Sequence, residues 1–139
     1  MPAELARGDR QLLALARYGR TLRGVSFAGQ DLTSIGTPGL VWFDRCCFDG
    51  ADLRQATAHG WHLKFCSLRT VDLRGASLRG ASFAGCDLTD ADLRGADLSG
   101  ARFSAVNTGD DSGRTVLTGA RLDPDALVGA TLDPGTVLP

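Results

Sequence analysis

Large apolar residues recur at every fifth position through the middle of the chain. Between residues 43 and 103 only Ala58 interrupts the series. Its members are Phe43, Phe48, Leu53, Leu63, Leu68, Leu73, Leu78, Phe83, Leu88, Leu93, Leu98 and Phe103. An α-helix repeats about every 3.6 residues and a strand about every 2.0, so neither keeps a five-residue spacing on one face. The pattern predicts a chain that turns a corner once per repeat.

A second spacing, of 20 residues, is superimposed on the first. Cys46, Cys66 and Cys86 are 20 residues apart. Outward positions recur in the same way, with three aspartates beside three arginines: Asp52, Asp72, Asp92, Arg54, Arg74 and Arg94. A fixed period of this size is typical of a solenoid, in which each coil buries its core by stacking on its neighbours. We therefore expect the large residues, and the small residues two positions before them, to point inward.

The repeats share a sequence motif. Residues 51–55, 91–95 and 96–100 read ADLRQ, ADLRG and ADLSG, which fit the pattern A(D/N)LxG. With these repeats the chain resembles the pentapeptide-repeat family over roughly residues 20–139. The resemblance implies an all-β fold, a right-handed quadrilateral β-helix in which four pentapeptides form one square coil.

Three segments depart from the repeat. Residues 3–18 are rich in helix formers, so we interpret residues 1–19 as an N-terminal capping α-helix, or else as a partner-binding helix. Residues 20–139 then form the β-helix. Two glycines and a proline in residues 34–39 are expected to absorb a one-residue slip of register. Polar residues at 104–115 predict a loop excursion, either purely structural or in contact with a partner.

Composition narrows the function classes. The chain has 139 residues, 43% of them apolar, and a formal net charge of −1. That balance argues against a general nucleic-acid surface. No apolar run approaches the roughly 18 residues that a membrane span needs. The N-terminus carries charged residues where a signal peptide would be apolar, so we expect a cytoplasmic protein without membrane contact.

The four cysteines are interpreted as free thiols. Cys46, Cys66 and Cys86 occupy the small inward site of successive coils, about 4.8 Å apart, which is beyond the Cβ separation of about 3.5–4.5 Å in a disulfide. Cys47 is expected to point outward. No CxxC or Cys/His spacing predicts zinc, and we expect neither a metal nor a cofactor.

Residues 59–65 carry the best candidate for a binding surface. Trp61 stands at an inward site that elsewhere holds Ala, Cys or Val, and a 20-residue projection places Trp42 beside His62. The projection also places Asp44 beside Lys64. Aromatic residues and arginine are enriched at interface hot spots. The candidate partner-binding residues are Trp42, Arg45, His59, Trp61, His62 and Phe65. The alternative is that Trp61 fills the corner above Ala58.

No catalytic triad, phosphate-binding loop or acid/base pair is present, so we expect a non-enzymatic protein-protein interaction module. The resemblance implies an alternative, because its characterised bacterial branch imitates DNA, binds DNA gyrase and protects it from quinolones or topoisomerase-targeting toxins. Such mimicry needs an acidic surface, whereas residues 43–103 contain eight Arg or Lys and eight Asp. A second alternative is a small-molecule binder or enzyme at the corner of His59, Trp61 and His62.

The C-terminal coil ends in Val137-Leu138-Pro139 with no helix after it. Exposed core and strand edges invite pairing with a second copy, most commonly with two-fold symmetry. We therefore predict a homodimer through residues 117–139, as the resemblance also implies. The candidate interface residues are Leu127, Leu132, Val137 and Leu138.

Overall fold

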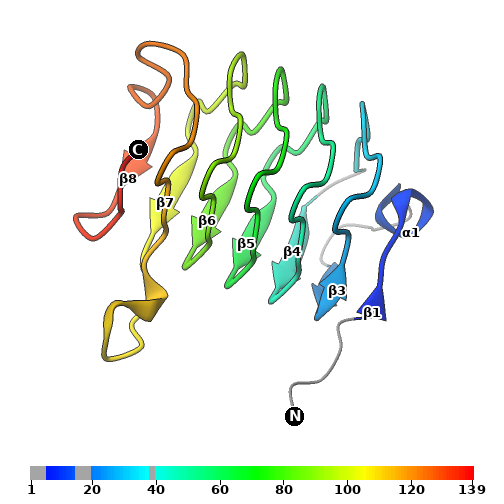
Figure 1. The fold of residues 1–139 in the computed structure, drawn as a ribbon, viewed down its shortest axis with the longest axis horizontal. Helices are drawn as coiled ribbons and strands as arrows, with labels where there is room; N and C mark the ends of the chain where they lie inside the picture. Colours follow the sequence, from blue (N-terminus) through cyan, green and yellow to red (C-terminus); the bar gives the residue numbers. More distant parts are fainter. Residues whose placement is uncertain (1–5, 15–19, 38–39) are drawn as a thin grey trace.

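Parallel strands stack along one side of a solenoid in this computed structural model, which describes residues 6–14, 20–37 and 40–139. The six-stranded sheet has the order β2-β4-β5-β6-β7-β8, with each coil adding one strand (Figure 1). The strands are β2 (Arg20–Arg23), β4 (Val41–Asp44), β5 (His62–Lys64), β6 (Ser82–Ala84), β7 (Arg102–Ser104) and β8 (Thr131–Leu132).

Three further ladders of parallel bridges run along the solenoid. Cys47 pairs with Ser67, Asp52 with Asp72, and Thr57 with Ser77, and each ladder continues into the next coil. Together with the sheet they give every complete coil four sides. The structure therefore confirms the quadrilateral β-helix expected from the sequence.

The inward columns are buried as the five-residue spacing predicts. Leu53, Leu73 and Leu93 are at most 2% exposed. Cys46, Cys66 and Cys86 are buried free thiols, and each Sγ donates a hydrogen bond to a carbonyl of the preceding coil. The hydrogen bond with the Cys66 thiol, together with burial, raises the pKa of Cys46. The Cys46 thiol therefore stays protonated, and all three cysteines act as small core residues.

The predicted slip of register is confirmed. Gly36 pairs with Thr57, an offset of 21 residues, whereas Trp42 pairs with His62, an offset of 20. The extra residue therefore lies between Gly36 and Val41. This position overlaps the end of residues 34–39, where the glycines and the proline predicted the slip.

The N-terminal segment differs from the predicted continuous helix. Strand β1 (Ala6–Arg7) pairs with β3 (Val25–Ser26), and only Arg10–Ala14 form helix α1. The first coil leaves backbone groups unpaired at its edge, and a two-residue strand satisfies them better than a helix would. Residues 1–5 and 15–19 of the predicted cap lie outside the described residues.

Helix α1 starts from a capped turn. The Asp9 carboxylate accepts a 2.9 Å hydrogen bond from the Leu12 amide, which satisfies one of the free donors at the helix start. Leu13 is fully buried and belongs to the hydrophobic core. Among the described residues no helix is both long enough and apolar enough to cross a membrane.

The loop after β7 inserts nine residues between two coils. The offset of paired residues rises from 20 at Ala84 and Ser104 to 29 at Asp87 and Val116. A short 3-10 helix, η1 (Asp111–Gly113), closes the loop, and the Val106 amide donates to the Gly113 carbonyl at 2.8 Å. Thr115 then takes the next place in the cysteine column, fully buried, and its hydroxyl accepts a 3.2 Å hydrogen bond from the Cys86 amide.

Candidate binding surface

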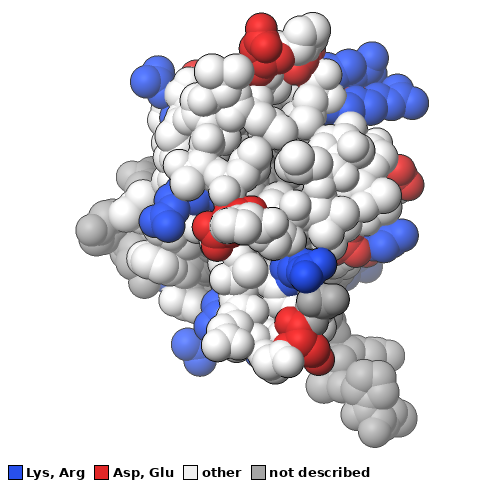
Figure 2. All heavy atoms as spheres, turned by 90° about the vertical axis from the view of Figure 1, so that its left-hand side faces the viewer, with Lys and Arg blue, Asp and Glu red and all other residues white. Residues whose placement is uncertain are grey.

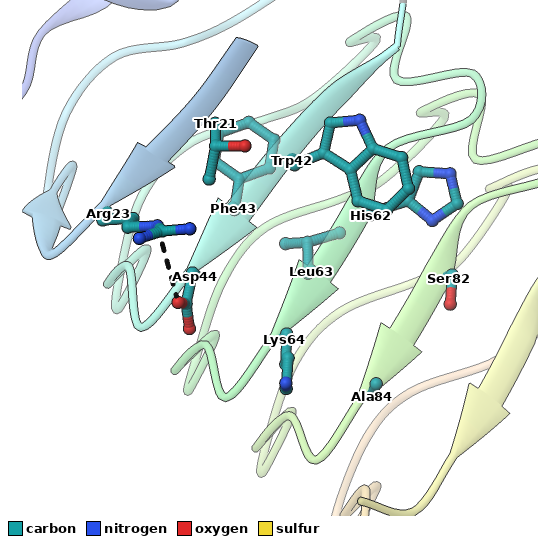
Figure 3. Close-up of a pocket in the computed structure, with 10 residues that line it drawn as sticks. All are labelled: Thr21, Arg23, Trp42, Phe43, Asp44, His62, Leu63, Lys64, Ser82 and Ala84. Carbon is teal, nitrogen blue, oxygen red and sulfur yellow. Dashed lines mark ion pairs between the residues drawn. The ribbon is translucent and has the colours of Figure 1, made fainter. Parts of the chain in front are cut away.

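The outer face of the six-stranded sheet carries a stacked aromatic pair. Trp42 on β4 and His62 on β5 are register partners, and their rings lie 3.9 Å apart at an interplanar angle of 9° (Figure 3). Parallel in-register strands lie about 4.8 Å apart, so outward rings on neighbouring strands stack without distorting the backbone. Trp42 is 43% exposed, which makes it one of the few large apolar side chains on the described surface.

A second aromatic contact lies at the corner that follows these strands. The Arg45 guanidinium carbon is 4.9 Å from the centre of the Phe65 ring, and the Lys64 ammonium is 5.8 Å from it. Both distances are within the range of cation-π attraction. We call Trp42, Arg45, His62, Lys64 and Phe65 the aromatic-basic face.

Two residues of this face have an unusual backbone. Arg45 has φ 54° and Phe65 has φ 53°, which place them in the left-handed region that glycine favours. The corresponding residue of the next coil is Gly85, where an added Cβ would come within 3.1 Å of the Phe65 ring. The Phe65 side chain therefore lies across Gly85, held in a conformation that is costly for a bulky residue.

Positive charge dominates the sheet. Asp44 is the only acidic residue in its six strands, and its carboxylate lies 2.8 Å from Arg45 and 3.9 Å from Arg23. The cationic residues on the strands are Arg20, Arg23, Lys64 and Arg102. Among the described residues Lys64 forms no ion pair. Burial lowers the pKa of His62, so its imidazole is neutral at pH 7.

A hollow of about 350 Å³ opens beside the stacked pair (Figure 3). Trp42, His62 and Lys64 form its large-residue side, whereas Ser82 and Ala84 on β6 line it with small side chains. This volume lies at the low end of small-molecule pockets, which hold about 300–1,000 Å³. It suits one or two side chains of a partner.

Trp61, one of the predicted partner-binding residues, lies inside the solenoid. It is 2% exposed and its ring centre is 4.8 Å from that of Phe43. Its indole Nε1 donates a 2.9 Å hydrogen bond to the Thr37 hydroxyl, which satisfies the one polar atom of the side chain. The small, fully buried Ala58 stands where other repeats hold Leu or Phe. We therefore exclude Trp61 from the candidate surface, and its burial favours the interpretation that it fills the corner near Ala58.

His59 also lies apart from the stacked pair. It is exposed and contacts the Ser77 hydroxyl, on the ladder that joins Thr57, Ser77 and Asp97. His62 lies on the sheet instead, so the two imidazoles belong to different sides of the coil. Trp42, Arg45, His62 and Phe65 are thus the four predicted site residues that the structure brings together.

Sequence reasoning missed several residues of the hollow. Arg23 lies beside Asp44 through the 21-residue offset of the first coil, and Ser82 lies beside His62 through the 20-residue offset. The same register places Arg102 beside Ser82. The offsets place these residues from the sequence alone, but a small residue such as Ser82 gives no sequence signal of a binding site.

Another side of the solenoid carries the Asp/Arg ladder, made of Asp52, Asp72, Asp92, Arg54, Arg74 and Arg94. Each aspartate pairs with the arginine two residues later at 2.6–2.7 Å. Each of the first two arginines also lies 3.8 Å from the aspartate of the next coil. Hydrogen bonds from Arg54 and Arg94 lower the pKa values of Asp52 and Asp92 to about 2. The ladder is electrically balanced.

The C-terminal end of the stack is apolar but only partly covered. Leu127 and Leu132 are half-buried against the core, whereas Val137 is 36% exposed and Leu138 is 52% exposed. Figure 2 shows this end as a mostly uncharged surface crossed by a few charged side chains. The four predicted interface residues thus lie in the last coil with apolar surface open to contact.

No group of three or more His, Cys, Asp or Glu side chains that could hold a metal ion occurs in the part of the chain that the structure describes.

Comparison with known proteins returns one family. A profile described as "Pentapeptide repeats" matches in eight copies, over residues 46–81 and 66–104. A search of curated proteins finds no match.

Several solved structures are similar to the chain. A pentapeptide-repeat protein from the Arabidopsis thaliana thylakoid lumen is 28% identical over 94% of this chain and 63% of its own, with a TM-score of 0.35. This chain therefore spans less than two thirds of that protein. A pentapeptide-repeat protein from Nostoc PCC 7120 is 26% identical over 81% and 76%, with a TM-score of 0.37. QnrB1, a plasmid-mediated fluoroquinolone resistance protein, is 20% identical over 92% and 76%, with a TM-score of 0.29.

The family match falls on the regular coils of the fold. The matched stretch coincides with the coils whose inward Leu and Phe columns are buried and whose outward aspartates form parallel bridges. The matched stretch, residues 46–104, thus carries pentapeptide repeats and folds as a β-solenoid.

Proposed function

We propose that this chain is a non-enzymatic protein-protein interaction module that binds a partner protein through the aromatic-basic face. The observation that carries the proposal is the exposed Trp42 ring stacked on His62. A tryptophan fixed by stacking loses little conformational freedom on binding, and Trp and Arg dominate interface hot spots.

The strained backbone at Phe65 supports the same surface. A glycine would occupy φ 53° without cost, yet this corner holds a phenylalanine that presents its ring to Arg45 and Lys64. The presence of a bulky residue in a costly backbone conformation favours a role that depends on its side chain.

Small-molecule binding or catalysis at the corner of His59, Trp61 and His62 loses its support. Trp61 is buried, and the two histidines lie on different ladders. The geometry therefore does not assemble the three groups that this alternative requires.

Binding to DNA gyrase, with protection from quinolones or a topoisomerase-targeting toxin, is the second candidate. QnrB1 is a fluoroquinolone resistance protein, and DNA mimicry would require a continuous acidic face. Here the columns of aspartates on the Asp/Arg ladder are neutralised by arginines, and the sheet is basic. We therefore rank gyrase below another protein partner. Capture of purified gyrase subunits by this protein would reverse that order.

We further propose that the module acts in the cytoplasm as a homodimer joined through its last coil. The four unpaired cysteines suit a reducing compartment. The apolar end formed by Leu127, Leu132, Val137 and Leu138 suits a two-fold contact. The double variant Leu132→Asp, Val137→Asp should be monomeric in light scattering, because a charge buried at the junction would stay unpaired. A monomeric unmodified protein, or a double variant that still dimerises, would contradict this arrangement.

Affinity capture with matched variants tests the proposed binding face. Trp42→Thr and Phe65→Gly should each lose a protein that the unmodified chain retains. Gln55→Gly is the control, because Gln55 has φ 60° and lies over Gly75 in the way that Phe65 lies over Gly85, but at another corner. The same set of captured proteins from all four baits would contradict the proposal.

A further inference from the structure

The hollow beside His62 has room for a planar group next to the stacked rings. Trp42 covers one face of the imidazole, and the next residue in the same row is Ser82, whose side chain is too short to stack on a ring. Ala84 follows Lys64 in the neighbouring row. Two large outward residues are thus followed by two small ones, and the row of stacked rings stops where the space begins (Figure 3).

Cations flank this space. Lys64 lines the hollow, and Arg102 follows Ser82 in the row that contains His62. Neither of them forms an ion pair with another described residue, whereas the nearby Asp44 carboxylate already contacts Arg45 and Arg23. The charge that remains uncompensated around the hollow is positive, which favours an anionic partner.

The neutral state of His62 fits a planar occupant. Burial keeps the imidazole uncharged at pH 7, so its open face is an aromatic surface rather than a second cation. A ring placed over Ser82 would continue the stack that Trp42 and His62 begin.

Resting on the proposed function above, we infer that this hollow seats an aromatic side chain from an acidic segment of the partner protein. The ring stacks on the open face of His62 over Ser82 and Ala84. Asp or Glu residues beside it in the segment pair with Lys64 and Arg102. The volume of about 350 Å³ admits one such side chain with its neighbours and leaves the rest of the segment on the sheet.

An acidic protein segment fits better than a single-stranded nucleic acid. A nucleic-acid strand needs a positively charged groove along its backbone and several stacking platforms in succession. Here there is one ring-sized space, the chain has a formal net charge of −1, and the arginines of the Asp/Arg ladder are already paired.

Peptide binding to the full chain tests this inference directly. The probes are fluorescein-labelled heptapeptides with six Asp or Glu residues around a central Trp, Tyr, Phe or Ala, and matched peptides with Lys in place of the acids. The acidic aromatic peptides should bind at least tenfold more tightly than the acidic Ala peptide and the Lys peptides in fluorescence anisotropy. NMR signals of Ser82 and His62 should shift during the titration.

Variants locate the binding in the hollow. Ser82→Leu fills the space and should weaken binding at least tenfold, whereas Thr57→Leu, at an exposed outward position of another ladder, should leave it unchanged. Lys64→Glu should weaken the acidic peptides and strengthen the Lys peptides. Circular dichroism and unfolding midpoints equal to those of the unmodified chain show that the variants are folded.

Three outcomes would overturn the inference: no binding of any acidic aromatic peptide up to about 1 mM, equal binding by Ser82→Leu and the unmodified chain, or tighter binding of oligothymidylate than of the peptides. If captured protein is lost from Trp42→Thr but retained by Ser82→Leu, the proposed binding face stands and the inference about the hollow fails. If Trp42→Thr loses no captured protein, the proposed function itself fails.

Discussion

The Asp/Arg ladder and the aromatic-basic face lie on the same coils but differ in how their outward residues vary from coil to coil. On the ladder, each coil repeats the same carboxylate and guanidinium, so every charge meets its opposite within its own coil. On the aromatic-basic face each coil contributes a different residue, and Trp42, His62 and Ser82 succeed one another in a single row. In the Asp/Arg ladder every charge is thus paired. The row of Trp42, His62 and Ser82 instead leaves one face of the His62 ring open and nearby cations without an ion pair to another described residue.

This contrast shows that the repeat constrains the residues at inward positions but leaves those at outward positions variable. Inward positions of both regions hold apolar residues because the bore must be filled at close-packed density. Outward positions need only be compatible with a parallel ladder, so their side chains are free to serve another purpose. If the proposed function is correct, departures from the repeat on the outside are where we expect binding specificity.

Removing the tryptophan beneath the aromatic-basic face should have the largest effect. Trp61→Ala should lower the free energy of unfolding by about 3–5 kcal/mol, because the cavity cannot collapse between Phe43 and Phe48. Trp61→Phe is the control, since it keeps most of the ring volume. Urea unfolding measures both free energies. Equal losses for the two variants would show that the volume of the side chain at position 61 does not determine the loss of stability.

An inward residue of the ladder region should behave similarly but more mildly. Leu73→Ala should cost about 2–5 kcal/mol because Leu73 is 2% exposed in the packed bore. Its outward neighbour Asp72→Ala should cost about 0–1 kcal/mol, as exposed ion pairs do. Similar losses at these two positions would contradict the assignment of inward and outward residues.

Backbone strain offers a sharper comparison of the two regions. Phe65→Gly should be more stable than Phe65→Ala by roughly 1 kcal/mol, because alanine at φ 53° carries the left-handed penalty and glycine does not. Gln55→Gly and Gln55→Ala should differ by a similar amount, since φ there is 60°. A difference confined to one corner would mean that the two backbones are not equivalent.

Acid should weaken the ladder before it changes the core. Asp52 and Asp92 have pKa values of about 2 in the folded chain, below the ordinary value of about 3.9, because Arg54 and Arg94 bind their carboxylates. Their contribution is present above about pH 4 and is lost as the pH falls toward 2. Between these pH values the double variant Asp52→Asn, Asp92→Asn should lose less stability than the unmodified chain, by about 0–1 kcal/mol per pair.

The smallest effect should come from His62. Burial lowers its pKa, so the unfolded chain takes up the proton first as the pH falls below about 6.5. The stability due to neutral His62 is therefore complete above that value and declines at lower pH. The difference in unfolding free energy between the unmodified chain and His62→Gln should shrink between pH 7.5 and pH 5. A constant difference would show that the ring does not change its charge on unfolding in this range.

Sequence periodicity was sufficient for the buried columns and for contacts between neighbouring coils. The stack of Trp42 on His62 and the approach of Arg45 to Phe65 both follow from the 20-residue projection. Periodicity fixes which residues are neighbours, because parallel in-register pairing leaves no freedom in that choice.

Other features depended on energies that the pattern does not contain. Ala6 and Arg7 stand among helix formers, yet the unpaired edge of the first coil makes them a strand, so tertiary pairing outweighs local propensity. The side to which Trp61 points was open in the sequence, because only the volume left by Ala58 decides it.

The nine-residue insertion has a consequence for how such a chain can change. The whole jump in offset occurs between Ser104 and Thr115, and both of these residues still keep their places beside Ala84 and Cys86. The coils on either side stay in step across this segment. We expect them to tolerate other loop lengths as well, because the free-energy cost of closing a loop rises only slowly with its length. We therefore expect this position to accept an inserted peptide or a loop of another length while the coils on either side keep their pairing.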